Sequence, residues 1–506
     1  MRIAQTLTAA VCLTGFALIG HADAEQRPSQ SVNPDAARAA AYTFFMRPPG
    51  PGKRYDTWAD ASGPDIGEVD ADPDRLPPRV DNSERPEFPP VYRQIHGTCG
   101  QYTAAATMFT YEMNVLNGTA ADSDERRFPA TFSWNMMNRA EKTGSEAYHG
   151  WEVAKRVGLP TIKTYGTVEK KKVGAWPNGY AIWRDAMGHR VSGYRYTPAQ
   201  TVEQLNEARG WLYDRNEPGA NKPGGLFAMD GRMGKRDVIK KVTKTIPEGQ
   251  HAEGEDLWTA WSATGYGHGM ACAGYDDRVG YDLNGDGEIT NDRDINGDGR
   301  VTLADWERGA YIVVNSWGDQ WSGDGKIYLL YSAMVDETWK RGRYLGRVEV
   351  AAYTPRLTLR FKMACNDRAN LRMTVGLSGD TGADEPEHTT APEAFNGWPV
   401  FGRSGPGHVP LAGPGDDTPL EAGIDLTPLL DAAGNNLGDQ AAVFLSMDLS
   451  PAKGSDDAQG ELIEAGLRRY DAEGVLIDET PIPFDEGVFR DEGIQIKAII
   501  DRPLSR

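Results

Sequence analysis

Cysteine is scarce in this sequence, with only four thiols among 506 residues. So few thiols cannot hold a chain of this length in a disulfide scaffold, and buried cores must therefore supply its stability. Cys12 lies in an N-terminal stretch with the pattern of a cleaved signal, which leaves three thiols in the mature chain. Because three is an odd number, at least one thiol is expected to remain unpaired.

Positive charge is in deficit as well. The chain has 54 Lys and Arg against 73 Asp and Glu, a formal net charge of −19. Such an excess of negative charge argues against nucleic acid or an anionic membrane surface as a partner. No long apolar run follows the N-terminal one, so a protein with several membrane spans is excluded. The length exceeds that of one domain, usually about 100–200 residues, and predicts two or three folded units.

The N-terminus has the pattern of a secretory signal peptide. Arg2 is followed by an apolar run at 9–19 and by an Ala-Asp-Ala sequence at 22–24, the kind of site that signal peptidases cut. The run is too short to span a bilayer stably. We therefore predict a signal peptide over residues 1–24 and a secreted or periplasmic mature protein. Residues 25–75 are rich in Pro, Asp, Ala and Gly, which favours a leader, a linker or a short propeptide.

Two differently patterned regions follow. Residues 76–353 mix a helix, expected at Ala104–Tyr111, with strands, expected at Tyr311–Val314 and Lys326–Leu330, and predict an α+β domain. In residues 354–506 alternating strands are separated by loops rich in Gly, Pro and Asp, with the first strands at Arg356–Met363 and Leu371–Val375. This pattern predicts a C-terminal all-β sandwich, a common accessory domain. Glycan, protein and the cell surface are its candidate ligands, and the sequence has no signature that chooses between them.

Three short segments carry the residues of a nucleophilic site. Cys99 lies where a Gly-x-Cys turn enters the apolar helix, and unsatisfied N–H groups there favour the thiolate. His268 begins a strand of small residues, and Asn315 ends another strand. A thiol with an imidazole makes an activated nucleophile, and an amide that orients the imidazole completes a Cys-His-Asn triad. Two tryptophans, Trp317 and Trp321, follow the asparagine closely.

The order and surroundings of these residues resemble the papain family of cysteine peptidases. The resemblance implies a two-lobed domain, with a helical lobe and a β-barrel-like lobe, that hydrolyses polypeptides through a thioester acyl-enzyme. It also implies that Gln94 donates to the oxyanion, that Trp317 shields the triad with Trp321 beside it, and that Gly144 belongs to the substrate cleft. The remaining thiols, Cys272 and Cys365, are interpreted as small buried hydrophobes.

The nucleophile segment departs from the family pattern. The family usually places the glutamine six residues before the nucleophile and a tryptophan after it, whereas Cys99 follows Gln94 by five residues and precedes Gly100. In a second register Tyr102 takes the nucleophile's place, which would make the chain a catalytically inactive binding protein. We favour Cys99, because this register needs a one-residue deletion instead of a two-residue insertion. A third interpretation keeps the thiol chemistry but directs it to acyl or amide transfer.

An insertion at 276–309 separates the histidine from the asparagine and contains two acidic loops. Asp, Asn and Gly recur in them at the spacing of EF-hand and dockerin calcium loops. The second loop is complete, with expected ligands Asp294, Asn296, Asp298, the Arg300 carbonyl and Asp305. The first offers Asp282, Asn284, Asp286 and Glu288, but its twelfth position is Arg293, so that Asp292 or Asp294 would have to close it. We predict one or two structural calcium ions.

Overall fold

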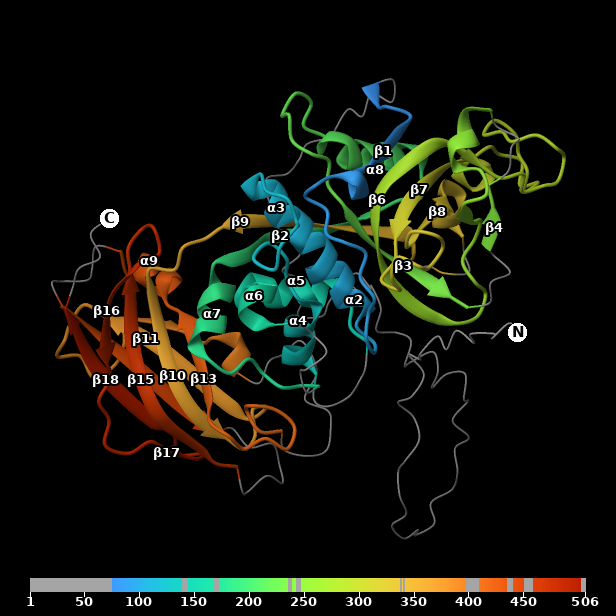
Figure 1. The fold of residues 1–506 in the computed structure, drawn as a ribbon. Coiled ribbons are helices and arrows are strands. Elements are labelled where there is room, and N and C mark those ends of the chain that lie inside the picture. Colours follow the sequence, from blue (N-terminus) through green and yellow to red (C-terminus); the bar gives the residue numbers. More distant parts are fainter. Residues whose placement is uncertain are drawn as a thin grey trace, which may run out of the picture. The chain divides into compact units, whose positions relative to one another are not determined.

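The computed structural model describes residues 75–138, 144–166, 173–234, 239–242, 247–336, 339, 342–396, 409–434, 440–449 and 458–501 (Figure 1). The predicted signal peptide, and the predicted leader apart from Arg75, lie outside these ranges. Within them no helix has the length and apolar character needed to cross a membrane.

Most helices of the first two thirds of the chain precede most of its strands, and this mixed content agrees with the predicted α+β class. The chain divides into two compact units, the first made of Met1–Ala130, Lys142–Trp151 and Val191–Val350, and the second of Thr131–Glu141, Glu152–Arg190 and Ala351–Arg506. The second unit thus combines the C-terminal region with two earlier segments. The domain boundaries drawn from the sequence remain a prediction.

A long helical run begins at Cys99. It consists of α2 (Cys99–Gln101), the π-helix η5 (Tyr102–Phe109) and α3 (Thr110–Asn117). The π-helical part is buried almost all round, as its run of Ala, Met and Phe predicts. The run ends where Gly118 adopts a left-handed conformation, φ 62°, and its N–H caps the last turn.

A nine-stranded sheet forms the core of the first unit, in the order β2-β9-β3-β6-β7-β8-β5-β4, with β1 paired to β6. Its core includes buried aromatic side chains of the sheet and of the helix α8 (Val202–Asp214), which packs on β6. The predicted strands at 311–314 and 326–330 are confirmed. The strands are β1 (Arg79–Asp81), β2 (His189–Pro198), β3 (Phe227–Met233), β4 (Ile239–Lys241), β5 (Asp256–Trp258), β6 (Tyr266–Gly280), β7 (Arg308–Val314), β8 (Lys326–Leu330) and β9 (Tyr344–Ala352).

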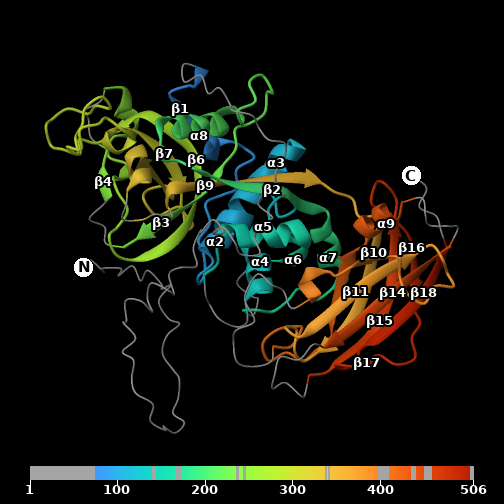
Figure 2. The ribbon, with the colours of Figure 1, turned by 180° about the vertical axis from the view of Figure 1, so that it is seen from behind.

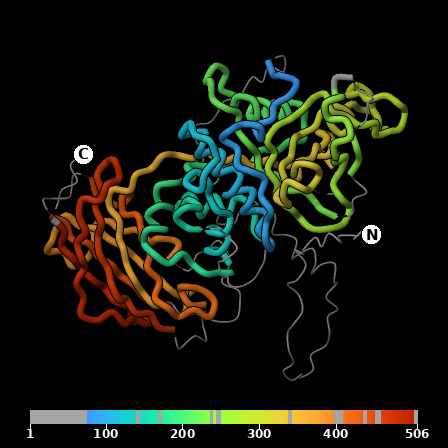
Figure 3. Tube along the Cα trace, viewed as in Figure 1, coloured from blue at the N-terminus to red at the C-terminus, as the bar shows by residue number. Residues whose placement is uncertain are grey.

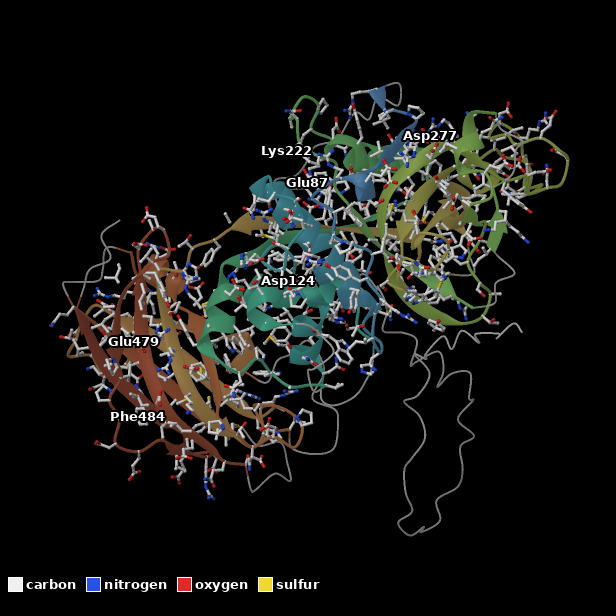
Figure 4. The ribbon with its side chains drawn as sticks, in the orientation of Figure 1. Glu87, Asp124, Lys222, Asp277, Glu479 and Phe484 are labelled. Carbon is white, nitrogen blue, oxygen red and sulfur yellow. The ribbon has the colours of Figure 1, made fainter. Side chains whose placement is uncertain are left out.

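Between β6 and β7 the chain makes an excursion from 281 to 302 without helix or strand, seen as open loops in Figure 3. Asp277, labelled in Figure 4, lies at the β6 end of this excursion and accepts from Tyr331 (2.8 Å) and Arg209.

The remaining helices are short. They are η4 (Asn82–Glu84), α4 (Ala130–Met137), α5 (Ala147–Arg156), α6 (Ile162–Tyr165), α7 (Tyr180–Met187), η8 (Pro247–Ala252), η9 (Leu303–Asp305) and η10 (Tyr331–Val335).

The C-terminal region forms two antiparallel sheets, drawn in orange and red in Figures 1 and 2. One has the order β13-β10-β15-β16 with β17 on β15, and the other the order β12-β11-β14-β18. Alternate residues of β10 are buried, as in a strand with one face on a core. The sandwich itself remains a prediction. The elements are β10 (Leu357–Cys365), β11 (Leu371–Ser378), β12 (His388–Thr390), η12 (Glu393–Phe395), β13 (Leu420–Asp425), α9 (Thr427–Ala433), β14 (Gln440–Leu449), β15 (Gly460–Tyr470), β16 (Leu476–Pro481), β17 (Val488–Phe489) and β18 (Ile494–Asp501).

Helix α7 is bonded to the first of these sheets within the second unit. The Tyr180 hydroxyl lies 2.6 Å from Thr358 Oγ1 and 2.7 Å from the Tyr470 hydroxyl. The Arg468 guanidinium covers the Tyr180 ring at 4.4 Å and is itself bonded to Glu479 at 2.8 Å. A helix from the middle of the chain and two C-terminal strands therefore share one buried polar contact.

Candidate active site

Two chain segments pair side by side and bring the predicted oxyanion donor to the predicted asparagine. The N–H of Gln94 donates to the carbonyl of Ser316 (2.7 Å), and the N–H of Gly318 donates to the carbonyl of Tyr92 (2.9 Å). Between these bonds a bridge joins the residues at 93 and 317. Gly318 has φ 90°, a conformation that glycine adopts without strain. The loop after β7 is thereby held against the segment that leads to Cys99.

His268 and Asn315 are hydrogen-bonded to each other. Nε2 of the imidazole lies 2.7 Å from Oδ1 of the amide. The backbone N–H of Ser316 also donates to this Oδ1, at 2.7 Å, which identifies the atom as the oxygen. Since oxygen only accepts, Nε2 must carry the proton in this bond. The neutral imidazole then has its lone pair on Nδ1.

The surroundings keep this imidazole neutral. Its residue is 1% exposed, and the Trp317 ring lies over it with centroids 4.7 Å apart. Burial lowers the pKa of His268 to about 4, although the hydrogen bond to Asn315 acts in the opposite direction. Trp321 packs on Trp317 at 5.3 Å, edge to face, and so supports the ring that covers the histidine.

Cys99 is the first residue of the helical run and is buried. The strand that carries His268 lies against the same helical face: a Cβ added to Gly269 would be 3.2 Å from the Cα of Gly100 and 3.5 Å from Thr103 Oγ1. Tyr102 faces other groups, since its ring packs 5.6 Å from Tyr92 in a small apolar cluster. The structure thus brings the start of the helix, the histidine strand and the asparagine loop together.

The segment after Gly144 reaches the start of the same helix. Nε2 of Gln101 donates to Oγ of Ser145 and to the carbonyl of Glu146, both at 2.9 Å. Gly144 is half-buried at the beginning of this segment. Neither Gln101 nor Ser145 was predicted to belong to the site, because nothing in their local patterns shows that they meet.

Asp230 is a second residue that the sequence did not single out. Its buried Oδ1 accepts the backbone N–H of His268 at 3.0 Å. A single acidic residue in the apolar strand β3 was the available signal, because a buried carboxylate needs a specific partner.

The two acidic loops have the same hydrogen-bond pattern but different closing residues. In the second, Asp305 accepts from the N–H groups of Ile295 (3.2 Å) and Asn296 (3.3 Å), and its other oxygen accepts from Thr302 (2.8 Å). In the first, Glu307 accepts from the equivalent N–H groups. One of its oxygens accepts from Leu283 (2.7 Å) and Asn284 (3.4 Å), and the other accepts from Thr290 (3.1 Å). Glu307 therefore holds the position that twelve-residue spacing assigned to Arg293.

Asp305 is buried and Asp282 is half-buried, whereas the other predicted ligands lie on exposed turns of these loops. Asp282 and Asp294 each accept N–H groups of their own loop, at positions four and six, over 2.6–2.8 Å. Arg293 pairs instead with Asp286 (3.4 Å) and Glu288. Among the described residues, no three His, Cys, Asp or Glu side chains are grouped to hold a metal ion.

The other two thiols of the described chain are buried and unpaired by any disulfide. Burial raises the pKa of Cys272, and it raises the pKa of Cys365 to about 12. Both thiols are therefore protonated at neutral pH, as expected of small buried hydrophobes.

No protein-family model matches the chain, and no curated protein matches it in sequence. Solved structures of cysteine proteases are similar to it. Xylellain, a cysteine protease from Xylella fastidiosa, is 14% identical, with 57% of this chain and 90% of that chain covered and a TM-score of 0.37. Bromelain protease from Ananas comosus, in complex with the E64 inhibitor, is 11% identical, with 54% and 99% covered and a TM-score of 0.34. Procathepsin B S9 from Trypanosoma congolense is 13% identical, with 62% and 89% covered and a TM-score of 0.36.

Proposed function

We propose that this chain is a papain-like cysteine endopeptidase with Cys99 as nucleophile and His268 as base. The observation that carries the proposal is the bond from His268 Nε2 to Asn315 Oδ1, because it leaves Nδ1 of a buried, neutral imidazole as a proton acceptor. The packing of Gly269 on Gly100 brings this histidine's strand to the residue that follows the thiol.

The proposed reaction has two stages. Nδ1 of His268 takes the thiol proton while Cys99 Sγ forms a bond to the peptide carbonyl carbon, and the carbonyl oxygen becomes an oxyanion. The side-chain N–H of Gln94 and the backbone N–H of Cys99 stabilise that charge. The C–N bond then breaks, and the imidazolium protonates the leaving amine. Water, deprotonated by the same imidazole, hydrolyses the thioester and restores the thiol.

The test compares hydrolysis of a denatured protein substrate by wild type and Cys99→Ala, with Tyr102→Phe as the matched control. We expect the alanine variant to lose all activity above background and Tyr102→Phe to keep it. Alkylation followed by peptide mapping should label Cys99 in the native chain. A Cys99→Ala variant that still hydrolyses the substrate would overturn the assignment.

Two other functions are distinguished by the same preparation. A catalytically inactive binding protein would neither hydrolyse substrate nor react with the alkylating reagent, and the packing of Tyr102 in an apolar cluster speaks against a tyrosine in the nucleophile's place. A thiol acyl or amide transferase would label at Cys99 but give joined products, which mass spectrometry of the reaction mixture detects.

We further propose that the insertion binds one or two structural calcium ions. Its side-chain donors are carboxylate and amide oxygens, which suit a hard cation. Asp294, Asn296, Asp298, the Arg300 carbonyl and Asp305 would hold one ion; Asp282, Asn284, Asp286, the carbonyl at Glu288 and the closing carboxylate of Glu307 would hold the second. Calcium would neutralise side chains that otherwise repel one another and would stiffen the excursion between the two triad strands.

Secretion is proposed from the signal pattern of residues 1–24, and N-terminal sequencing of the exported protein tests it. A start near Glu25 supports signal cleavage alone, and a start near Leu76 indicates further removal of the leader. The C-terminal region is proposed to be a sandwich that binds glycan, protein or the cell surface.

A further inference from the structure

The loop between Gln94 and Cys99 is closed by an unusual backbone conformation. His96 has φ 50°, in the left-handed region that residues with a side chain rarely adopt. Next to it, Thr98 Oγ1 donates to the carbonyl of Ile95. The tight turn fits a loop that is one residue shorter than the resemblance to the papain family predicts.

This turn directs the carbonyl of His96 onto the side chain of Gln94, whose Nε2 donates to it at 3.1 Å. On the other side, Ser316 Oγ lies 2.7 Å from Gln94 Oε1. A carboxamide can exchange its oxygen and nitrogen by rotation. A hydroxyl can bond to either end because it both donates and accepts, whereas a backbone carbonyl only accepts. The carbonyl of His96 is therefore the partner that selects one orientation.

We propose that His96 is a positioning residue of the oxyanion site. Its left-handed backbone holds the nitrogen end of the Gln94 amide in place, and the second N–H of that nitrogen is then available to the developing oxyanion. The inference rests on the proposed peptidase function, and its chemistry requires no atom of the imidazole ring. Any residue that accepts a left-handed conformation should therefore serve at this position.

The experiment compares His96→Gly with His96→Val. Glycine adopts the left-handed region freely, whereas a β-branched residue disfavours it strongly. We expect kcat for a small peptide substrate to fall about tenfold in His96→Val and to stay within about twofold of wild type in His96→Gly, with KM nearly unchanged in both. A role of the imidazole in catalysis would instead lower kcat in the glycine variant.

Alkylation of Cys99 by iodoacetamide separates positioning from general distortion. Displacement at a saturated carbon develops no carbonyl oxyanion, so the alkylation rate should be the same in wild type and both variants. In a Gln94→Ala background, His96→Val should cause no further loss of kcat, because the group through which it acts is gone.

Equal kcat in the glycine and valine variants overturns the inference, and so does a His96→Val effect that persists in the Gln94→Ala background. A valine variant whose alkylation slows as much as its hydrolysis also overturns it, because the change is then one of the whole site. A wild-type chain with neither hydrolysis nor labelling at Cys99 rejects the proposed function itself, and the inference with it.

Discussion

The carbonyl oxygen of Ser145 occupies the space in which a side chain on Gly100 would begin. A Cβ built on Gly100 would lie 1.9 Å from that oxygen, far inside van der Waals contact. The oxygen belongs to the backbone and a Cβ is fixed to its own backbone, so neither atom can rotate away. The glycine that follows Cys99 is thus required by the close approach of the segment after Gly144, and the tryptophan expected from the family pattern has no room here.

Gly100→Ala should therefore destabilise the protein and impair the proposed site. We expect the free energy of unfolding to fall by about 1–3 kcal/mol, the usual cost of overpacking. Gly188→Ala is the control, because Gly188 has ordinary backbone angles and its nearest neighbour would lie 3.5 Å away. Urea denaturation of both variants measures the difference. Equal midpoints for the two would contradict the close approach.

Asn315→Ala should lower kcat/KM about tenfold, since one hydrogen bond that fixes the imidazole tautomer is lost. This bond joins His268 Nε2 to Asn315 Oδ1 and keeps the proton on Nε2. Without it, the proton of the imidazole can lie on either ring nitrogen. Gln320→Ala, an exposed change in the same loop, should leave activity as it is. Steady-state kinetics on a peptide substrate gives both values, and an unaffected Asn315→Ala would argue against the triad.

Stability should fall in mild acid because histidines are buried in their neutral form. Burial lowers the pKa of His268 to about 4 and that of His149 to about 3. The unfolded chain, with histidine pKa near 6.5, therefore binds more protons than the folded chain between about pH 6.5 and these lower values. Each group reduces the free energy of unfolding by up to about 1.4 kcal/mol per pH unit as the pH falls through this window.

His149→Gln isolates one of these contributions. Nδ1 of His149 accepts the N–H of Glu146 at 3.1 Å, and a glutamine oxygen can accept the same bond without titrating. Unfolding measured from pH 7 to pH 4.5 should show a shallower loss of stability for the variant than for wild type. Identical slopes would mean that folding does not lower the pKa of His149.

Local sequence patterns predicted those elements whose structure depends on the residues of a single strand or helix. The run at 326–330 became β8 with the predicted bounds, since alternating burial and β-branched or aromatic residues favour a strand. The apolar run at 104–111 became helical, but its π-helical form was not foreseen. Apolar residues on all sides of a helix give no periodicity from which to read the number of residues per turn.

The parts of the site that the sequence missed depend on segments far apart in the chain. Ser145 meets Gly100 across 45 positions, and Asp230 meets the backbone of His268 across 38. Glu307 escaped notice for a different reason: it lies beyond the second loop, so the twelve-residue spacing of the first cannot reach it.

The contact between α7 and the C-terminal sheet should be worth measurable stability. Tyr180→Phe removes a hydroxyl that lies within 2.7 Å of both Thr358 and Tyr470 and leaves those two buried partners unsatisfied. We expect a loss of about 1–3 kcal/mol. Tyr213→Phe, at a half-exposed ring, should cost almost nothing. Thermal unfolding compares the two variants, and similar melting temperatures would show that this contact contributes little to stability.

Calcium binding should depend on Glu307 for one ion and on Asp305 for the other. Glu307→Gln keeps an oxygen for the N–H groups of Leu283 and Thr290 but removes the negative charge that would close the first loop. We therefore expect titration calorimetry to find two ions in the wild type and one in this variant. Asp305→Asn should remove the other ion.

Asp292→Asn is the matched control, because Asp292 is the alternative closing residue suggested by sequence spacing and should leave two ions bound. Saturating calcium should also raise the melting temperature of the wild type, since an ion at about a hundred times its Kd adds about 2.7 kcal/mol to the folded state. Two ions in Glu307→Gln, or one in Asp292→Asn, would reject Glu307 as the closing ligand. An unchanged melting temperature with and without calcium would reject the structural role, because an ion that binds only the folded insertion must stabilise it.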